Sequence, residues 1–213
     1  MTVTAWAPEA TGRHEAPLSL EPILGWRVWR LTRGVRGLRL RALATPDAWP
    51  PNEADAARCF VSDHPGAPRA DCTCGYHAAS SVDALIGAGV LGHGVAVLGA
   101  IAMWGTVIEH AHGARAEFAY PARLRLVCTP CFRAGSIVDP ATVAAASPLL
   151  PLCGGHWRSN GAGQQKASVV EAELLATYGV DVLPRQPTRP RRRRLRSPQV
   201  GWLLFRKRGA STI

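Results

Sequence analysis

Lysine is almost absent from this 213-residue chain, although the chain is strongly basic. Only Lys166 and Lys207 are lysines among its 25 basic residues, and 15 acidic residues leave a formal net charge of +10. Such a preference for arginine is typical of a GC-rich genome, so we do not take it as evidence of function. Because 47% of the residues are apolar, the chain can form one well-packed domain with tails, or two small domains.

Acidic residues are absent from residues 184–213, and this absence locates the positive charge. Ten of the basic residues lie in this tail, so residues 1–183 have no net charge. The tail is rich in Pro and Arg and cannot bury a core, which predicts disorder. A run of arginines neutralises phosphates, so we expect the tail to bind nucleic acid. The residues expected to bind are Arg189, Arg191, Arg192, Arg193, Arg194, Arg196, Arg206, Lys207 and Arg208.

An apolar segment, Trp-Leu-Leu-Phe at residues 202–205, interrupts this basic tail just before Arg206. An apolar anchor beside positive charge can dock on an anionic membrane, stack on nucleobases or bind a groove on a protein partner. An inert, solvated tail is the alternative that the composition allows.

A charged start followed by an apolar run is absent from residues 1–20, so we see no secretory signal and expect a flexible arm there. This absence favours a cytoplasmic location. In that compartment the six cysteines are expected to be reduced or metal-bound rather than paired in disulfides.

Charged residues are also absent from residues 84–108, a stretch long enough to span a membrane. Six glycines, His93 and the lack of a flanking basic cluster argue against a transmembrane helix. Two buried strands at residues 95–98 and 101–108 fit this stretch as well. Membrane association, through 84–108 or through 200–208, remains a further alternative.

Signatures of the common enzyme classes are absent. We find no G-x-S-x-G, P-loop or dinucleotide fingerprint, and no His-x-Glu of the zinc deaminases. The stretch EHAHG contains Glu109, His110 and His112, and His110 and His112 would share one face of a strand and could hold a metal. A polar hairpin turn is the plainer interpretation. A metal-dependent enzyme that uses this cluster is therefore the alternative function.

Alternation of apolar and basic residues at 25–43 predicts a β-hairpin with a glycine-containing turn. Arg27, Arg39 and Arg41 would form either a cationic stripe or an ordinary solvated outer face. Residues 109–127 predict a second hairpin with a turn at HAHG and a proline at its rim.

Three helices are expected. Residues 80–89 contain serines able to cap a short helix, and residues 139–147 begin with an Asp-Pro pair that favours a helix start. Residues 164–180 carry apolar side chains every four residues and a glycine that can end the helix. We therefore predict an α+β fold of antiparallel β-hairpins followed by a zinc-pinned helical unit. The expected parts are a flexible arm (1–20), a β-rich domain with a Cys/His loop (21–127), a zinc-binding helical module (128–183) and a disordered Arg-rich tail (184–213).

Four residues have the spacing of a zinc site. Cys128 and Cys131 form a Cys-x2-Cys, and Cys153 and His156 form a Cys-x2-His 21 residues later. Zinc prefers four Cys or His ligands on a tetrahedron, and two intervening residues let a pair turn toward one point. The alternatives are a thioredoxin-like redox pair or free buried cysteines. A glycine and a proline soon after Cys131 argue against the long helix that a redox pair opens.

The other three cysteines form a second candidate set with a histidine. Cys59, His64, Cys72 and Cys74 lie in a loop rich in Pro and Gly, which a metal would help to order. His77 competes with His64 for the fourth place. Structural cysteines without metal, or one mixed site from both sets, are the alternatives. The sequence therefore predicts one or two Zn²⁺ ions.

Residues 126–180 resemble treble-clef and zinc-ribbon modules through this ligand spacing. The stretches CTCGYHA and GARAEFAYP, with the Cys-x2-Cys, make residues 25–130 similar to uncharacterised Cys-containing proteins of high-GC actinobacteria and their phages. That resemblance implies no activity. The sequence as a whole predicts a non-enzymatic zinc-binding module that binds nucleic acid largely through its tail, with a protein partner as the other open class of ligand.

Overall fold

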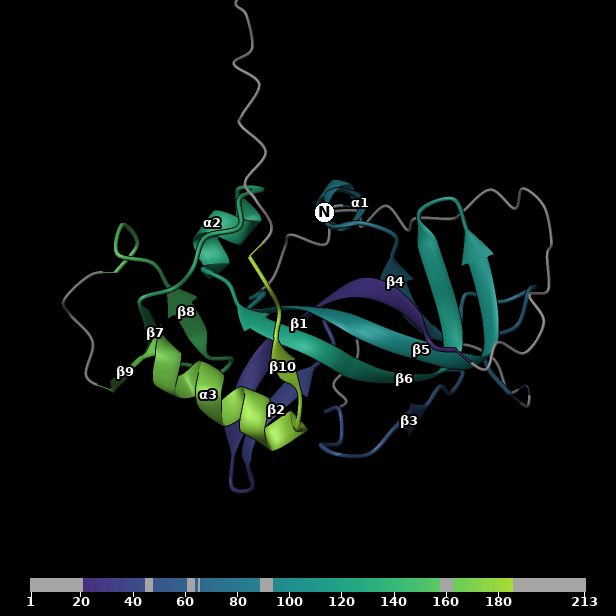
Figure 1. The fold of residues 1–213 in the computed structure, drawn as a ribbon, viewed down its shortest axis with the longest axis horizontal. Coiled ribbons are helices and arrows are strands. Elements are labelled where there is room, and N and C mark those ends of the chain that lie inside the picture. The colour runs from purple at the N-terminus through teal and green to yellow at the C-terminus, as the bar shows by residue number, and fades with distance from the viewer. Residues whose placement is uncertain are drawn as a thin grey trace, which may run out of the picture. The chain divides into compact units, whose positions relative to one another are not determined.

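The computed structural model describes residues 21–44, 48–60, 64, 66–88, 94–157 and 163–185 (Figure 1). These residues form an α+β fold that is rich in antiparallel strands, as the sequence predicts. The elements are β1 (Ile23–Gly34), β2 (Gly37–Arg41), β3 (Asp55–Ala56), β4 (Tyr76–Ala79), α1 (Val82–Gly87), β5 (Val97–His110), β6 (Gly113–Leu126), α2 (Thr129–Arg133), β7 (Thr142–Ala144), β8 (Leu150–Leu152), β9 (Gln164–Lys166), α3 (Ala167–Tyr178) and β10 (Asp181–Val182).

The chain divides into a compact unit, Met1–Leu183, and a second unit, Pro184–Ile213. The expected Arg-rich tail coincides with the second unit, and from residue 186 onward it lies outside the described residues. The expected arm, residues 1–20, lies outside them too. The predicted boundary between residues 127 and 128 falls inside the first unit.

Four strands of the main sheet pair in a closed circuit, in which each strand is hydrogen-bonded to two of the others. β1 pairs with β5, β5 with β6, β6 with β4, and β4 with β1, all antiparallel. The circuit brings two backbones close together at Gly25, where an added Cβ would lie only 2.4 Å from the Cβ of Ala78. Strands β2, β3 and β10 extend the sheet, and β10 pairs with β6 in parallel.

The apolar stretch before residue 110 forms one long strand, β5, where the sequence predicts two. Its pairing with β6 shifts register between Ala100 and Ile101 and again between Trp104 and Val107. Such bulges let a long strand bend without ending it. Pro121 lies inside β6 beside the first shift, rather than at the rim, because a bulge tolerates a residue without an N–H.

The predicted turn at HAHG joins β5 to β6, and His110 pairs with Gly113. Among the described residues no helix is both long and apolar enough to cross a membrane.

The predicted helix at residues 139–147 is wrong, because this segment contains strand β7. β7 lies between β8 and β9 in a three-stranded antiparallel sheet, and the side chain of Val143 is buried against the core. The neighbouring strands bond its backbone on both sides, and this outweighs the local preference of a run of alanines.

The other two predicted helices are confirmed, but the helix predicted for residues 164–180 begins only at Ala167, because Gln164–Lys166 form β9 and pair with β7. In α1 the hydroxyl oxygen of Ser81 accepts a hydrogen bond from the backbone N–H of Ala84, which caps the helix. α3 ends at Gly179, which adopts the left-handed conformation expected of a terminating glycine.

A single buried core joins residues before and after position 128. Trp29 of β1 and Leu40 of β2 belong to the same core cluster as Val143 of β7 and Leu174 of α3. Tyr178, at the end of α3, accepts a hydrogen bond from the N–H of Leu40 at 2.9 Å and donates one to the carbonyl of Trp49 at 2.9 Å.

The hairpin predicted for residues 25–43 is confirmed as β1 and β2, but Arg27 does not lie with Arg39 and Arg41. Its guanidinium lies 5.2 Å from the ring centre of Trp49 and donates to the carbonyl of His77 at 2.6 Å. Burial lowers the pKa of Arg27 to about 10, so the side chain remains charged near neutral pH. In the observed register Arg30 is the arginine that lies opposite Arg41.

Candidate metal centres

Two groups of side chains in the described part of the chain could hold a metal ion. In each group four ligand atoms all lie within 4.8 Å of one another. We call Cys128, Cys131, Cys153 and His156 the knuckle cluster, and Cys59, His64, Cys72 and Cys74 the loop cluster. These are the eight residues predicted from the sequence, and they form two separate groups rather than one mixed site.

The first pair of the knuckle cluster is positioned by α2. Cys128 is the residue before the helix, and its carbonyl accepts a hydrogen bond from Phe132 at 2.8 Å. Cys131 lies in the helix, and its carbonyl accepts from Ser136 at 2.9 Å. Phe132 and the thiol of Cys128 are buried, which anchors this short helix to the rest of the protein. The two thiols are thereby held on one side of a tight turn.

The second pair lies in a turn after β8. The N–H groups of His156 and Trp157 both donate to the carbonyl of Cys153, at 3.0 and 2.9 Å. β8 is paired with β7, and the N–H of Ala141 donates to the carbonyl of Leu152 at 2.8 Å. The small sheet therefore carries the second pair to the first.

The distances in the knuckle cluster match a tetrahedral metal site. Nδ1 of His156 lies 3.3 Å from the Sγ of Cys131, 3.3 Å from that of Cys153 and 3.5 Å from that of Cys128. The Sγ atoms of Cys131 and Cys153 are 3.7 Å apart. A tetrahedral zinc ion with ordinary bond lengths has edges of about 3.8 Å between sulfurs and about 3.6 Å between sulfur and nitrogen. A disulfide would bring two sulfurs to about 2.05 Å, so this group is not a redox-paired disulfide.

The surroundings shift the pKa values of two knuckle thiols, Cys131 and Cys153, in opposite directions. Burial raises the pKa of Cys131 to about 12, with contributions from the neighbouring Cys128 and Cys153. Burial also acts to raise the pKa of Cys153, but hydrogen bonds from His156 and Cys128 lower it to about 6 overall. Three sulfurs this close ionise together only when a cation neutralises them. The group therefore has the chemistry of a cation site.

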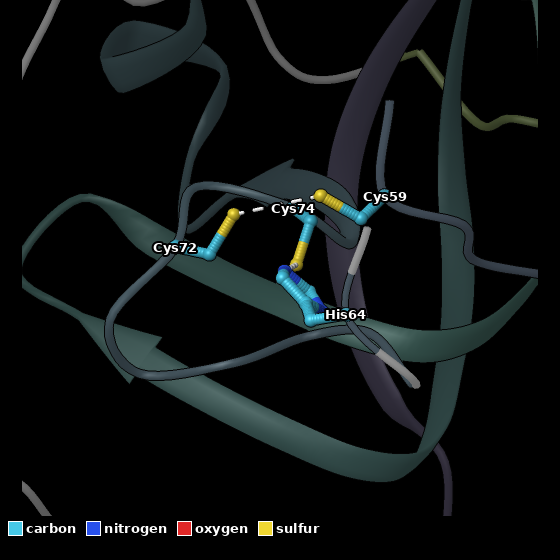
Figure 2. A group of neighbouring side chains, drawn as sticks. All are labelled: Cys59, His64, Cys72 and Cys74. Atoms are coloured by element: carbon cyan, nitrogen blue, oxygen red, sulfur yellow. Dashed lines mark hydrogen bonds between the residues drawn. The ribbon is translucent and has the colours of Figure 1, made fainter. Parts of the chain in front are cut away.

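The loop cluster has the same geometry on a different support. Figure 2 shows Cys59, Cys72 and Cys74 gathered around His64. The Sγ atoms of Cys59 and Cys72 are 3.7 Å apart, and the Sγ of Cys74 lies 3.7 Å from Nε2 of His64. Both distances are close to the edges of a tetrahedral site. Cys59 follows β3, and the other three ligands precede β4.

His64 is held in the tautomer that a metal requires. Its Nδ1 lies 3.0 Å from the carbonyl oxygen of Gly66, and a nitrogen that bonds to a carbonyl must carry the proton. Nε2 therefore presents its lone pair toward the cysteines, as in ligand histidines whose second nitrogen is bonded to the backbone. His77, the competing histidine, does not belong to this group, and its Nε2 bonds to the carbonyl of Thr73 at 2.7 Å.

The hydrogen bond with His64 is also the main reason that the pKa of Cys72 falls to about 6. The same contact with Cys72 raises the pKa of His64. Cys72 and His64 therefore share one proton between sulfur and nitrogen, and a metal that binds both atoms displaces it.

Arg115 is a component of the loop cluster that sequence reasoning missed. It lies on β6, its side chain is buried, and its Nη1 donates to the carbonyl of Cys74 at 3.0 Å and to that of Cys72. The guanidinium thus holds the Cys-x-Cys turn and adds positive charge beside three sulfurs. The alternation of residues along this strand indicates only that Arg115 is exposed. No local pattern in the sequence therefore reveals that Arg115 supports the loop cluster.

Gly75 makes the close approach of this turn to β6 possible. Its φ is +116°, and an added Cβ would lie 2.9 Å from the Cβ of Pro68 and 3.3 Å from the carbonyl of Ala116.

The alternative cluster of Glu109, His110 and His112 is not brought together with either group. Glu109 and His110 are consecutive residues at the end of β5, so their side chains leave opposite faces of the strand. His112 lies in the following turn. Of the three, none belongs to the metal-capable groups found in the described residues.

The residues predicted to contact nucleic acid lie outside the described residues, and so does the apolar segment 200–208. The nine basic residues concerned are Arg189, Arg191, Arg192, Arg193, Arg194, Arg196, Arg206, Lys207 and Arg208.

Comparison with known proteins gives no relative from which a role could be transferred. No protein-family model, curated protein sequence or solved structure matches this chain.

Proposed function

We propose that this protein is a non-enzymatic, zinc-binding module that binds nucleic acid largely through its Arg-rich tail. The observation that carries the metal part is the pair of complete four-ligand groups with tetrahedral spacing. Each group consists of three cysteines and one histidine, and all six cysteines of the chain are used.

Zinc is the metal that these ligands favour. Thiolate ligands with one imidazole disfavour magnesium and calcium, which prefer oxygen, and a tetrahedral Cys3His set is typical of structural zinc. Four protein ligands leave no coordination position for a substrate or water, so we assign both ions a structural role. The ligand spacing and its resemblance to treble-clef and zinc-ribbon modules support the same assignment.

The nucleic-acid part rests on the distribution of charge. The folded unit is neutral overall, whereas residues 184–213 carry ten positive charges and no negative ones. Such a segment attracts the phosphate backbone without selecting a base sequence. We place the protein in the cytoplasm, where thiol ligands stay reduced. The resemblance to uncharacterised actinobacterial and phage proteins supports no activity beyond binding.

Metal analysis of the purified full-length protein tests the first part. We expect two zinc ions per chain, one in Cys131→Ser and one in Cys72→Ser, because each substitution removes a ligand from a different cluster. His77→Gln is the matched control and should retain both ions. Zero zinc in the parent protein would contradict the proposal. As a second measurement, cobalt(II) is bound in place of zinc, and its absorption spectrum reports a tetrahedral thiolate site. This measurement does not depend on the yield of the variants.

Salt titration of nucleic-acid binding tests the second part. In a full-length variant, the nine tail residues predicted to bind are replaced by glutamine. For a single-stranded oligonucleotide, we expect the slope of log Kobs against log salt to become shallower by about 6, since each lost phosphate contact contributes about 0.7. Equal affinity and equal slope in both proteins would rule out the tail as the main contact.

A further inference from the structure

A cavity opens on the large sheet, between β5, β6 and the segment that leads from α3 into β10. Its volume is about 650 Å³, and the residues that line it include Glu53, Ala102, Trp104, Tyr120 and Asp181. We call this space the sheet cavity. Sites for small molecules have volumes of about 300–1,000 Å³, so the sheet cavity is large enough for a small ligand. None of the eight metal-ligand candidates lines it.

The register of β5 and β6 places the aromatic part of the lining. Ala102 lies directly opposite Tyr120, and Trp104 follows two residues after Ala102 on the same strand. Residues opposite each other, and residues two apart on one strand, project to the same face of a sheet. Met103 projects to the other face and is buried in the core. The two aromatic side chains therefore lie on the solvent side of β5 and β6, and the small side chain of Ala102 leaves space beside them.

The bulge in β6 brings Asp181 onto this same face. Arg123 lies opposite Ala100 and Tyr120 lies opposite Ala102, because the register shift leaves one extra residue of β6 between them. Ala100 and Ala102 share a face, so Arg123 and Tyr120 share it too. Asp181 is the parallel partner of Arg123 in β10 and projects to the same side. Without the bulge, the carboxylate of Asp181 would project away from Tyr120.

Hydrogen bonds fix the wall of the cavity that carries Glu53. The hydroxyl of Tyr120 accepts from the N–H of Asn52 and donates to the carbonyl of Tyr178, both at 2.7 Å. Asn52 has a left-handed φ of 58°, which a residue other than glycine rarely adopts. Gly179 passes so close that an added Cβ would lie 3.0 Å from Oδ1 of Asn52. The wall is therefore formed before a ligand arrives.

The charged side chains that line the sheet cavity are both acidic. Glu53 and Asp181 are exposed, and no lysine or arginine is among the described residues of the lining. Neither carboxylate forms an ion pair with another described residue. Carboxylates form strong hydrogen bonds with ammonium groups, and aromatic rings attract cations as well. The two carboxylates are not among the metal-capable groups of the described residues, so the lining favours an organic cation.

We propose that the sheet cavity binds a small aliphatic polyamine. Two ammonium groups of the ligand bind the carboxylates of Glu53 and Asp181. Its methylene groups pack against Ala102, Trp104 and Tyr120, because an aliphatic chain gains from leaving water beside apolar and aromatic surface. This site uses neither the zinc ligands nor the tail, so it goes beyond the proposed function and stands apart from it.

Isothermal titration calorimetry on the full-length protein, freed of nucleic acid, tests the charge and the shape of the ligand. The probes are spermidine, putrescine, butylamine with one ammonium group, and butanediol with none. We expect one saturable site for spermidine and for putrescine. Butylamine should bind about 10-fold more weakly than putrescine, because it leaves one carboxylate without its charged hydrogen bond. Butanediol should not bind.

Substitutions in the lining test the residues. Glu53→Gln and Asp181→Asn should each weaken spermidine binding about 10-fold, since each removes one charged hydrogen bond. Trp104→Leu should weaken it about 3-fold through loss of the cation–π attraction. The matched controls are Glu109→Gln and Asp83→Asn, two exposed carboxylates that do not line the cavity, and both should keep the affinity of the parent.

Circular dichroism checks that each variant is folded. Absence of saturable spermidine binding by the parent at millimolar concentration overturns the proposal. Equal weakening in the two control variants also overturns it, because binding would then follow overall charge. Butanediol that binds as well as putrescine would show that the cavity does not select a cation. An acetylated trilysine amide that binds more tightly than spermidine would assign the cavity to a protein partner instead. Zinc content and the salt slope of DNA binding test the proposed function separately.

Discussion

At the scale of single residues, Arg115 contributes most to the loop cluster among the side chains that are not ligands. A buried arginine must be compensated, and here the carbonyls of Cys72 and Cys74 accept its hydrogen bonds. If the proposed zinc ion is bound, three cysteine thiolates and the ion together carry a charge of −1, which the guanidinium of Arg115 would offset. The arginine therefore acts both on the shape of the ligand turn and on its charge.

We predict that Arg115→Met weakens zinc binding at the loop cluster by about 10–100-fold, the usual cost of losing a group that orients a ligand. Competition with a chromogenic chelator measures the affinity of each site. The knuckle cluster should keep its affinity, because the hydrogen bonds of the Arg115 side chain go to the loop. Arg69→Gln is the control for loss of one positive charge near the cysteines, since the Arg69 side chain bonds to Asp71 and not to a ligand backbone. Equal weakening in both variants would show that Arg115 has no particular role.

At the scale of elements, α3 is joined to the β1–β2 hairpin by apolar packing, by the ion pair of Arg33 with Glu173, and by the buried hydroxyl of Tyr178. The hydroxyl of Tyr178 links the N–H of Leu40 to the carbonyl of Trp49, both of them buried. Tyr120 has a similar arrangement nearer the surface, where its hydroxyl accepts from Asn52 and donates to the carbonyl of Tyr178, both at 2.7 Å. These two residues make a natural comparison.

We predict that Tyr178→Phe lowers the free energy of unfolding by about 1–3 kcal/mol, because it leaves a buried N–H and a buried carbonyl without a partner. Tyr120→Phe should cost less, about 0.5–1 kcal/mol, since water can replace its hydroxyl. Urea denaturation of the zinc-loaded protein measures both values. A larger loss in Tyr120→Phe would contradict the assignment of Tyr178 as the buried link.

Elements also show where local sequence and observed structure diverge. The segment 139–147 has a good helix start and a run of alanines, but β7 pairs on both sides in the small sheet. Helix preference is a weak local term, whereas a strand between two neighbours gains bonds from residues far away in the sequence. For this reason α3 could be predicted and β7 could not.

At the scale of the whole molecule, the two candidate metal sites lie beside an apolar core that contains none of their ligands. The main core includes Trp29 and Ile101 of the large sheet and Tyr178 of α3, and none of the eight ligands belongs to it. The knuckle cluster attaches to a second, smaller core through Phe132. We therefore expect a bound metal to order the segments around the ligands, while burial of apolar surface stabilises the sheet.

We predict that removal of zinc by a chelator causes local rather than global unfolding. Hydrogen exchange should accelerate at residues 66–75 and 153–157, which lie beside the ligands and outside the two buried cores. Strand β7, whose Val143 belongs to the main core, and strands β5 and β6 should keep their protection. Mass spectrometry of the exchanged peptides measures this directly. If β5 and β6 lost protection together with the ligand loops, the metal would be required for the entire fold.

The sequence by itself determined the six cysteines of the two candidate sites, the pairing of Cys153 with His156, the β1–β2 hairpin, helix α3 and the α+β class. Spacing within each Cys-x2-Cys or Cys-x2-His pair, and alternation along a strand, are local properties that the chain carries without help from distant residues. Only the tertiary structure decided which histidine joins the loop cluster, that Arg115 supports it, and that Arg30 instead of Arg27 faces Arg41. Each of these depends on strand register and on a partner about 10 to 45 residues away, and register follows from burial of the whole core.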